Sequence, residues 1–121
     1  MNIQNILLPT IILLFLDSIF LFFSKKMFDE QIASVQRVSI QINYVGVILS
    51  YLFIILGLYF LIIKPKRSVY EAFILGVVIY GVYETTNYAT LKRWNPKIVI
   101  MDTLWGGILL STTTYLSYKF M

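Results

Sequence analysis

The chain has 121 residues, the size of a single domain, and a formal net charge of +4. Apolar residues make up 59% of it and charged residues 13%; soluble domains are about 45–50% apolar, so the composition indicates a membrane protein. The absence of Cys and His excludes disulfides, the usual zinc sites and imidazole acid–base chemistry. Lys and Arg fall between apolar segments rather than along one face, which is typical of loops between membrane spans and not of nucleic-acid binding.

Four apolar segments are each close to the ~20 residues that cross a ~30 Å hydrocarbon core. The first contains one charge, Asp17, and the second contains none. The third and fourth carry polar residues, so they are credible as spans where those residues face protein instead of lipid. The sequence therefore predicts an all-α fold, one domain over residues 1–121 that forms an integral membrane bundle of four transmembrane helices. The expected spans cover residues 6–23, 45–63, 72–91 and 98–118.

The segment between the first two spans, residues 25–44, has a helical apolar pattern. Phe28, Ile32, Val35 and Ile42 recur at i, i+4, i+7 and i+14, and most of the charged residues fall elsewhere. This pattern favours a short amphipathic helix on the membrane surface, with a solvated loop as the alternative.

Three carboxylates fall inside the expected spans. With four spans, the ends of the first and third and the start of the fourth lie on the same side of the membrane. At ~1.5 Å per residue, Asp17, Glu84 and Asp102 then lie ~9, ~10 and ~6 Å inside that surface. We therefore expect the three carboxylates at similar depth in one half of the bilayer.

Helical spacing places these polar groups toward the centre of the bundle. At 100° per residue, Gly76, Tyr83, Glu84 and Asn87 share one side of the third span. In the fourth span, Gly106 follows Asp102 by one turn, and small residues favour close helix contact in membranes. The candidate polar site consists of Asp17, Tyr83, Glu84, Asn87, Asp102 and Trp105.

The second half of the chain carries a recognisable pattern. It reads Tyr83-Glu84-x-Thr86-Asn87-x-Ala89-Thr90-Leu91, then Trp94, then Asp102-x-x-Trp105-Gly106. This resembles an uncharacterised family of small four-helix membrane proteins, domain of unknown function 2177, with Glu84 in place of the usual Asp. The resemblance implies a four-helix membrane fold, no established activity, and relatives in bacteria and large DNA viruses.

The carboxylates have two interpretations. In the structural one, donors such as Tyr80, Tyr83, Thr86, Trp105, Lys25, Lys92 and Arg93 satisfy them inside the fold. In the functional one, they form a proton relay, a cation site or a headgroup site. The sequence favours the structural interpretation, and it predicts no catalytic residue, no metal site and no cofactor, since the usual bundle metal sites include His.

We therefore expect a non-enzymatic structural or interaction component of a membrane-associated assembly, in a cell membrane or the inner membrane of a virion. The expected partners are the lipid bilayer and other membrane or capsid proteins or a second copy of the chain, with no nucleic acid. The alternatives are a small transporter or proton- or ion-handling protein that uses the carboxylates, and an enzyme acting on lipid.

The positive charges indicate an orientation. Six Lys and Arg residues lie on the side of the carboxylates and four on the side of the termini, so the former side is expected to be cytoplasmic.

Overall fold

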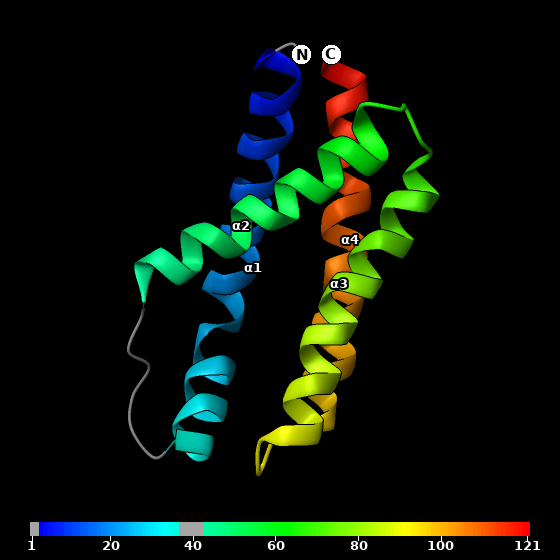
Figure 1. Cartoon of the computed structure of the whole chain (residues 1–121). Coiled ribbons are helices and arrows are strands. Elements are labelled where there is room, and N and C mark those ends of the chain that lie inside the picture. The colour runs from blue at the N-terminus through cyan, green and yellow to red at the C-terminus, as the bar shows by residue number, and fades with distance from the viewer. Residues whose placement is uncertain (1–2, 37–42) are drawn as a thin grey trace.

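The structure is a computed structural model that describes residues 3–36 and 43–121. These residues form helices joined by short connections, and the described part of the chain contains no strand. α1 begins and α4 ends at the same end of the bundle, and the turn between α3 and α4 lies at the other end (Figure 1). The helices are α1 (Ile3–Gln36), α2 (Tyr44–Leu58) with its π-helical continuation η1 (Tyr59–Ile63), α3 (Val69–Thr90) and α4 (Pro96–Phe120).

Polar residues define where α3 and α4 begin. The Ser68 hydroxyl accepts a hydrogen bond from the Glu71 backbone N–H at 3.1 Å and donates to the Glu71 side chain at 3.2 Å, so Ser68 is the N-cap of α3. The Asn95 side chain accepts from the Lys97 backbone N–H at 2.8 Å. Pro96 follows at the first position of α4, where its missing N–H needs no partner. The two helices therefore start where sequence rules place a helix start.

The end of α1 differs from the prediction. Instead of ending near Phe23, α1 continues without a break to Gln36, so residues 25–36 extend the first helix and are not a separate interfacial helix. Phe28 and Ile32, two residues of the predicted amphipathic pattern, line a pocket inside the bundle. The last part of the predicted interfacial helix, residues 37–42, lies outside the described residues.

The closest helix contact joins α3 to α4 through glycines. A Cβ atom added to Gly76 would lie 2.0 Å from the carbonyl oxygen of Gly106 and 2.9 Å from the Cα of Gly107. A Cβ added to Gly106 would meet the Tyr80 ring at 2.4 Å, and one added to Gly107 would meet Phe73 at 2.7 Å. Small residues allow this approach of two backbones, as is common between membrane helices.

The apolar core lies toward the end of the bundle that holds the termini. Leu13 of α1, Leu58 of α2 and Leu109 of α4 are fully buried there. The Tyr118 hydroxyl lies 3.1 Å from the Ile62 carbonyl oxygen in η1, so it joins the end of α4 to the π-helical turn. The core consists of Leu13, Ile55, Leu58, Tyr59, Ile62, Ile63, Ala72, Leu109 and Leu110.

Two stretches of the described chain are long and apolar enough to cross a membrane, Ile3–Ser34 and Tyr44–Ile63. They contain the first and second predicted spans. The predicted third and fourth spans are helical, as α3 and α4, but their more polar composition does not by itself mark them as spans.

The glycine contact can be tested with a single methyl group. Gly76→Ala should lower the free energy of unfolding by about 1–3 kcal/mol, because its Cβ would meet backbone atoms that no side-chain rotation moves aside. Gly57→Ala is the matched control, since a Cβ at Gly57 meets nothing within 4 Å, and it should be neutral or stabilising by up to about 1 kcal/mol. Unfolding in detergent micelles, followed by circular dichroism, measures both. Equal stability of the two variants would contradict the close contact.

Candidate functional site

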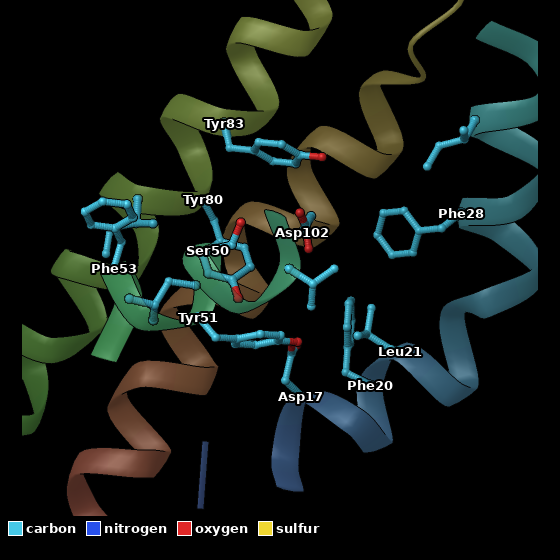
Figure 2. Close-up of a pocket in the computed structure, with 14 residues that line it drawn as sticks. Asp17, Phe20, Leu21, Phe28, Ser50, Tyr51, Phe53, Tyr80, Tyr83 and Asp102 are labelled. Atoms are coloured by element: carbon cyan, nitrogen blue, oxygen red, sulfur yellow. The ribbon is translucent and has the colours of Figure 1, made fainter. Parts of the chain in front are cut away.

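A pocket of about 680 Å³ lies among α1, α2, α3 and α4. Figure 2 shows Asp17 and Asp102 at this pocket, with Phe20 and Phe28 of α1 on one side and Tyr80 and Tyr83 of α3 on the other. Its walls are mainly apolar and aromatic, and the polar groups enter from several helices. The pocket is lined by Asp17, Phe20, Leu21, Phe28, Ile32, Val47, Ser50, Tyr51, Phe53, Ile54, Ile79, Tyr80, Tyr83 and Asp102.

Asp17 connects three helices. It is 6% exposed and accepts a hydrogen bond from the Trp105 indole N–H of α4 at 3.0 Å. Its second carboxyl oxygen accepts from the Tyr51 hydroxyl of α2. The Trp105 ring also stacks on Phe20, with ring centroids 4.5 Å apart and planes 4° from parallel. Asp17 therefore has a donor for each oxygen, and these bonds hold α2 and α4 against α1.

Glu84 and Asp102 form a second set of buried carboxyl groups. Glu84 is fully buried and accepts from the Trp94 indole N–H at 2.8 Å through Oε1, while no N–H or alcohol group of the described residues donates to Oε2. Asp102, 6% exposed, hydrogen-bonds with the Glu84 carboxyl, which requires that one of the two acids holds a proton, and it also lies close enough to feel the charge of Asp17. Asp102 faces the pocket, and Glu84 does not line it. Asp102 thus stands between the pocket and Glu84.

The remaining residues of the predicted site occupy different places. Tyr83 lines the pocket but is 56% exposed. Asn87 is one turn further along α3, where its side chain contacts the Tyr83 hydroxyl, and it does not line the pocket. The structure therefore brings Asp17, Tyr83 and Asp102 to one pocket, with Trp105 and Glu84 in direct contact with this group and Asn87 at its edge.

The depths of the carboxylates differ from the sequence estimate. The Gln31 side chain of α1 contacts the backbone of the α3–α4 turn, donating to the Arg93 carbonyl at 2.6 Å and accepting from the Asn95 N–H at 3.0 Å. Counted from this contact, Asp17 lies fourteen residues along α1 (~21 Å) and Asp102 lies seven residues along α4 (~10 Å). The predicted equal depth assumes a first span that ends at Phe23, whereas α1 continues to Gln36.

Several hydrogen-bond partners were not predicted from the sequence. Of the predicted donors, Trp105 does bind a carboxylate, but Lys25 pairs with the exposed Asp29 at 2.6 Å. Instead, Tyr51 donates to Asp17 and Trp94 donates to Glu84. A signal for Tyr51 was present, because Ser50-Tyr51 is a polar interruption in a long apolar run. Nothing in the local sequence indicates the Gln31 contact, since its partners lie sixty-two and sixty-four residues away.

A metal ion is not suggested by the residues that the structure describes. Among residues 3–36 and 43–121, no group of three or more acidic side chains is arranged to hold one. The role of the six predicted residues as a functional site stays a prediction.

Comparison with known proteins identifies the family. A family model described as "Predicted membrane protein (DUF2177)" matches residues 2–119. The chain belongs to this family. The predicted resemblance is therefore confirmed, and together with the two apolar helices it indicates a membrane protein. No curated protein and no solved structure was found to match the chain.

The hydrogen bond between Trp105 and Asp17 can be tested by Trp105→Phe, which keeps an aromatic ring beside Phe20 but removes the N–H. The free energy of unfolding should fall by about 1.5–3 kcal/mol, because a buried carboxylate loses a donor. Tyr115→Phe, at an exposed position of α4, is the control and should change little. A double-mutant cycle with Asp17→Ala separates the hydrogen bond from the lost ring volume. Additive effects of the two substitutions would contradict the bond.

The contact of Gln31 with the turn can be tested by Gln31→Ala. This change leaves the Arg93 carbonyl and the Asn95 N–H without their side-chain partner, and two lost hydrogen bonds of about 1 kcal/mol each should destabilise the fold by about 2 kcal/mol. Glu30→Ala, at the exposed neighbouring position, should have almost no effect. Hydrogen exchange measured by mass spectrometry should also show faster exchange in the turn of the Gln31 variant alone. Unchanged exchange there would contradict the contact.

Proposed function

We propose that this chain is a multi-pass integral membrane protein whose four helices all lie in the bilayer. Its role is that of a non-enzymatic structural or interaction component of a membrane assembly. The observation that carries the proposal is the exposure of large apolar side chains along every helix.

Most of the exposed large apolar residues of α3 and α4 form regular stripes. On each helix they recur about every four residues, so they lie on one face, opposite the glycine contact. Soluble monomers rarely expose apolar surface of this extent. Lipid is the simplest cover for both stripes. Those on α3 are Tyr70, Ile74, Val78 and Val82, and those on α4 are Ile100, Leu104, Ile108 and Tyr115.

The contact between Gln31 and the α3–α4 turn gives α1, α3 and α4 a common reference height. The position of a membrane surface can be counted from it. α1, α3 and α4 run alongside one another (Figure 1), so positions equally far from this contact lie at similar heights. Phe23, the last apolar residue before the first lysines, is eight residues or ~12 Å from Gln31, and Thr85 and Thr103 are at the same distance from the turn. A membrane surface at Phe23 therefore leaves the polar run after Val82 at or outside that surface, where water and headgroups solvate it.

The hydrogen bonds of the carboxylates support a non-enzymatic role. Asp17 accepts from Tyr51 and Trp105, and Glu84 accepts from Trp94. These bonds use the carboxylates to join helices, as the structural interpretation requires. The exposed apolar stripes remain available to lipid, to other membrane proteins or to a second copy of the chain.

The pocket beside Asp102 favours one alternative, the handling of a small ligand or ion, because it brings an open volume to a buried carboxyl group. The two roles make different demands on Asp102. Assembly with partners does not require its charge, whereas ligand handling does.

The four-span arrangement can be tested by cysteine labelling, since the chain has no native Cys. Single variants Ser34→Cys and Lys92→Cys should react with a membrane-impermeant maleimide from one side, and Pro65→Cys and Met121→Cys from the other. The positive charges predict that the first pair faces the cytoplasm. Detergent-solubilised protein, in which all four sites should react, is the control. Labelling of Ser34→Cys and Lys92→Cys from opposite sides would overturn the arrangement.

A further inference from the structure

The pocket is partly open, and the beginning of α2 forms its least covered wall. Val47, Ser50 and Phe53 line the pocket although each is exposed on the surface. The buried residues of α2 begin only at Ile55, and α2 crosses the other helices obliquely (Figure 1). In the membrane placement proposed above, on which this inference rests, this wall adjoins the lipid, so a molecule dissolved in the bilayer can enter the pocket from the side of α2.

The carboxyl groups at the pocket already have partners within the fold. Asp17 accepts hydrogen bonds at both oxygens, from Tyr51 and from Trp105. Asp102 shares a hydrogen bond with the Glu84 carboxyl, so one of these two acids carries a proton. Neither lining carboxyl group therefore needs a cation from outside the protein. The negative charge on Asp17 does oppose an anionic head group, because like charges repel strongly where water is scarce.

Among the described polar residues of the pocket, Tyr80 alone lacks a partner. Ser50 donates to the Gly46 carbonyl at 2.9 Å, and Tyr83 forms a hydrogen bond with the Asn87 side chain. The Tyr80 hydroxyl has no hydrogen-bond partner among the residues that the structure describes. A tyrosine hydroxyl inside a protein usually has one. The unmet hydrogen bond of Tyr80 is therefore available to a molecule in the pocket.

The position of Tyr80 is fixed by the contact between α3 and α4. A Cβ atom added to Gly106 would lie 2.4 Å from the Tyr80 ring, so the ring packs directly against the α4 backbone. Figure 2 shows the Tyr80 side chain inside the pocket, beside Asp102 and Ser50. The hydroxyl interacts electrostatically with Asp17 and with Asp102, so it lies among the polar groups of the pocket. The helix contact therefore holds a hydrogen-bond donor in place before any ligand binds, which reduces the entropy cost of binding.

The rest of the pocket suits an apolar chain. Its volume of about 680 Å³ lies within the ~300–1,000 Å³ that ligand pockets occupy. Figure 2 shows Phe20, Leu21 and Phe28 on one side and Phe53 near the α2 wall. Pockets of this kind bind mainly through apolar contact and orient the ligand with a few polar groups. Here the free polar group is an uncharged hydroxyl, so the matching ligand is a largely apolar molecule with one uncharged polar group.

We propose that this pocket binds an uncharged lipid whose polar group is an oxygen acceptor, such as an ester or a ketone. The Tyr80 hydroxyl donates a hydrogen bond to that oxygen. The apolar chain lies against Phe20, Phe28 and Phe53 and leaves the pocket past α2 toward the bilayer. The site depends on the hydroxyl of Tyr80, which distinguishes it from the alternative role described above, since that role requires the charge of Asp102.

The probe for this site is the methyl ester of dodecanoic acid with a bromine atom on its chain, because bromine quenches tryptophan fluorescence at short range. Trp105 stacks on Phe20, a lining residue, so it reports occupation of the pocket. The protein is held in nanodiscs of ether-linked phosphatidylcholine, which contain no ester carbonyl. The brominated ester should quench saturably, and the unbrominated ester should reverse the quenching.

Two brominated compounds of the same chain length test which chemistry the pocket selects. Bromododecane lacks the oxygen and should bind about fivefold more weakly than the ester, as expected for the loss of one uncharged hydrogen bond. Bromododecanesulfonate carries a negative charge and should also bind more weakly than the ester, because Asp17 repels it. An ester that binds no more tightly than the alkane or the sulfonate would overturn the proposal.

Tyr80→Phe removes the hydroxyl and keeps the ring that packs on Gly106. It should lower the affinity for the ester about fivefold, to that for the alkane, and leave the affinity for the alkane unchanged. The free energy of unfolding without ligand should stay the same, whereas loss of a structural hydrogen bond would lower it. Tyr88→Phe, at an exposed position of α3, is the control and should change neither affinity.

Unchanged ester affinity in a folded Tyr80→Phe variant would contradict the assignment. If that variant does not fold, the comparison of the ester with the alkane on the unmodified protein decides alone.

Ser50→Phe tests whether the quenching comes from this pocket. Ser50 lies in the exposed wall of α2, and its hydroxyl bonds to the backbone of its own helix. A larger side chain there should fill the pocket without breaking a hydrogen bond between helices. Saturable quenching by both the ester and the alkane should be lost. Its persistence in the folded variant would place the site elsewhere and overturn the proposal.

The result can be separated from the test of the membrane arrangement. Four-span labelling together with no preference for the ester would overturn the lipid site and leave the proposed function intact. A different labelling pattern together with ester binding that depends on Tyr80 would overturn the four-span arrangement but retain the site.

Discussion

The close approach of α3 and α4 is the constraint on which the other features of the bundle depend. Gly76 lies so near the backbone of Gly106 that no larger residue fits between the two helices. This contact fixes the rotation of each helix about its axis. Two turns after Gly76, Glu84 is thereby directed into the bundle, and one turn before Gly106, Asp102 is directed toward it. The positions of the two carboxyl groups follow from backbone contact and not from any attraction between them.

Bringing like charges together in this way creates a demand for donors that the rest of the fold meets unevenly. Trp94, at the end of the turn, reaches back to Glu84, and Trp105 reaches across to Asp17 on α1. Each indole brings a donor on a large apolar ring, so it can cross an apolar interior without leaving a second polar group unsatisfied. Asp102 lies between these two arrangements and receives neither indole. The same geometry that connects the helices therefore leaves one carboxyl group facing the pocket with another acid, Glu84, as its hydrogen-bond partner.

Some of these features are predictable from the sequence and others are not. The reason is physical: local signals can be read from the sequence, and contacts between distant residues cannot. The four helices could be predicted because apolar runs, caps and prolines act locally, and the inward face of Glu84 followed from helical periodicity. The glycine pair in α4 also indicated a close helix contact. The extension of α1 beyond Phe23 was not predictable in this way, because its charged and polar residues resemble a surface helix. What holds it is Gln31, whose partners lie on the distant α3–α4 turn. The predicted depth of Asp17 is wrong for the same reason, because it is measured from Phe23, where α1 does not end.

Part of the most apolar helix is exposed while more polar helices pack closely, which is the reverse of what a soluble protein would show. The first part of α2 is almost purely apolar, yet residues 44–50 are all exposed. α3 and α4, which carry the glycines and the carboxylates, pack most closely. In water the most apolar helix would be buried first, because burial removes its surface from the solvent. In lipid that advantage disappears, and helices associate through small residues and interhelical hydrogen bonds instead. The oblique course of α2 therefore fits a lipid surrounding, and it leaves open the side of the bundle at which the pocket and Asp102 are found.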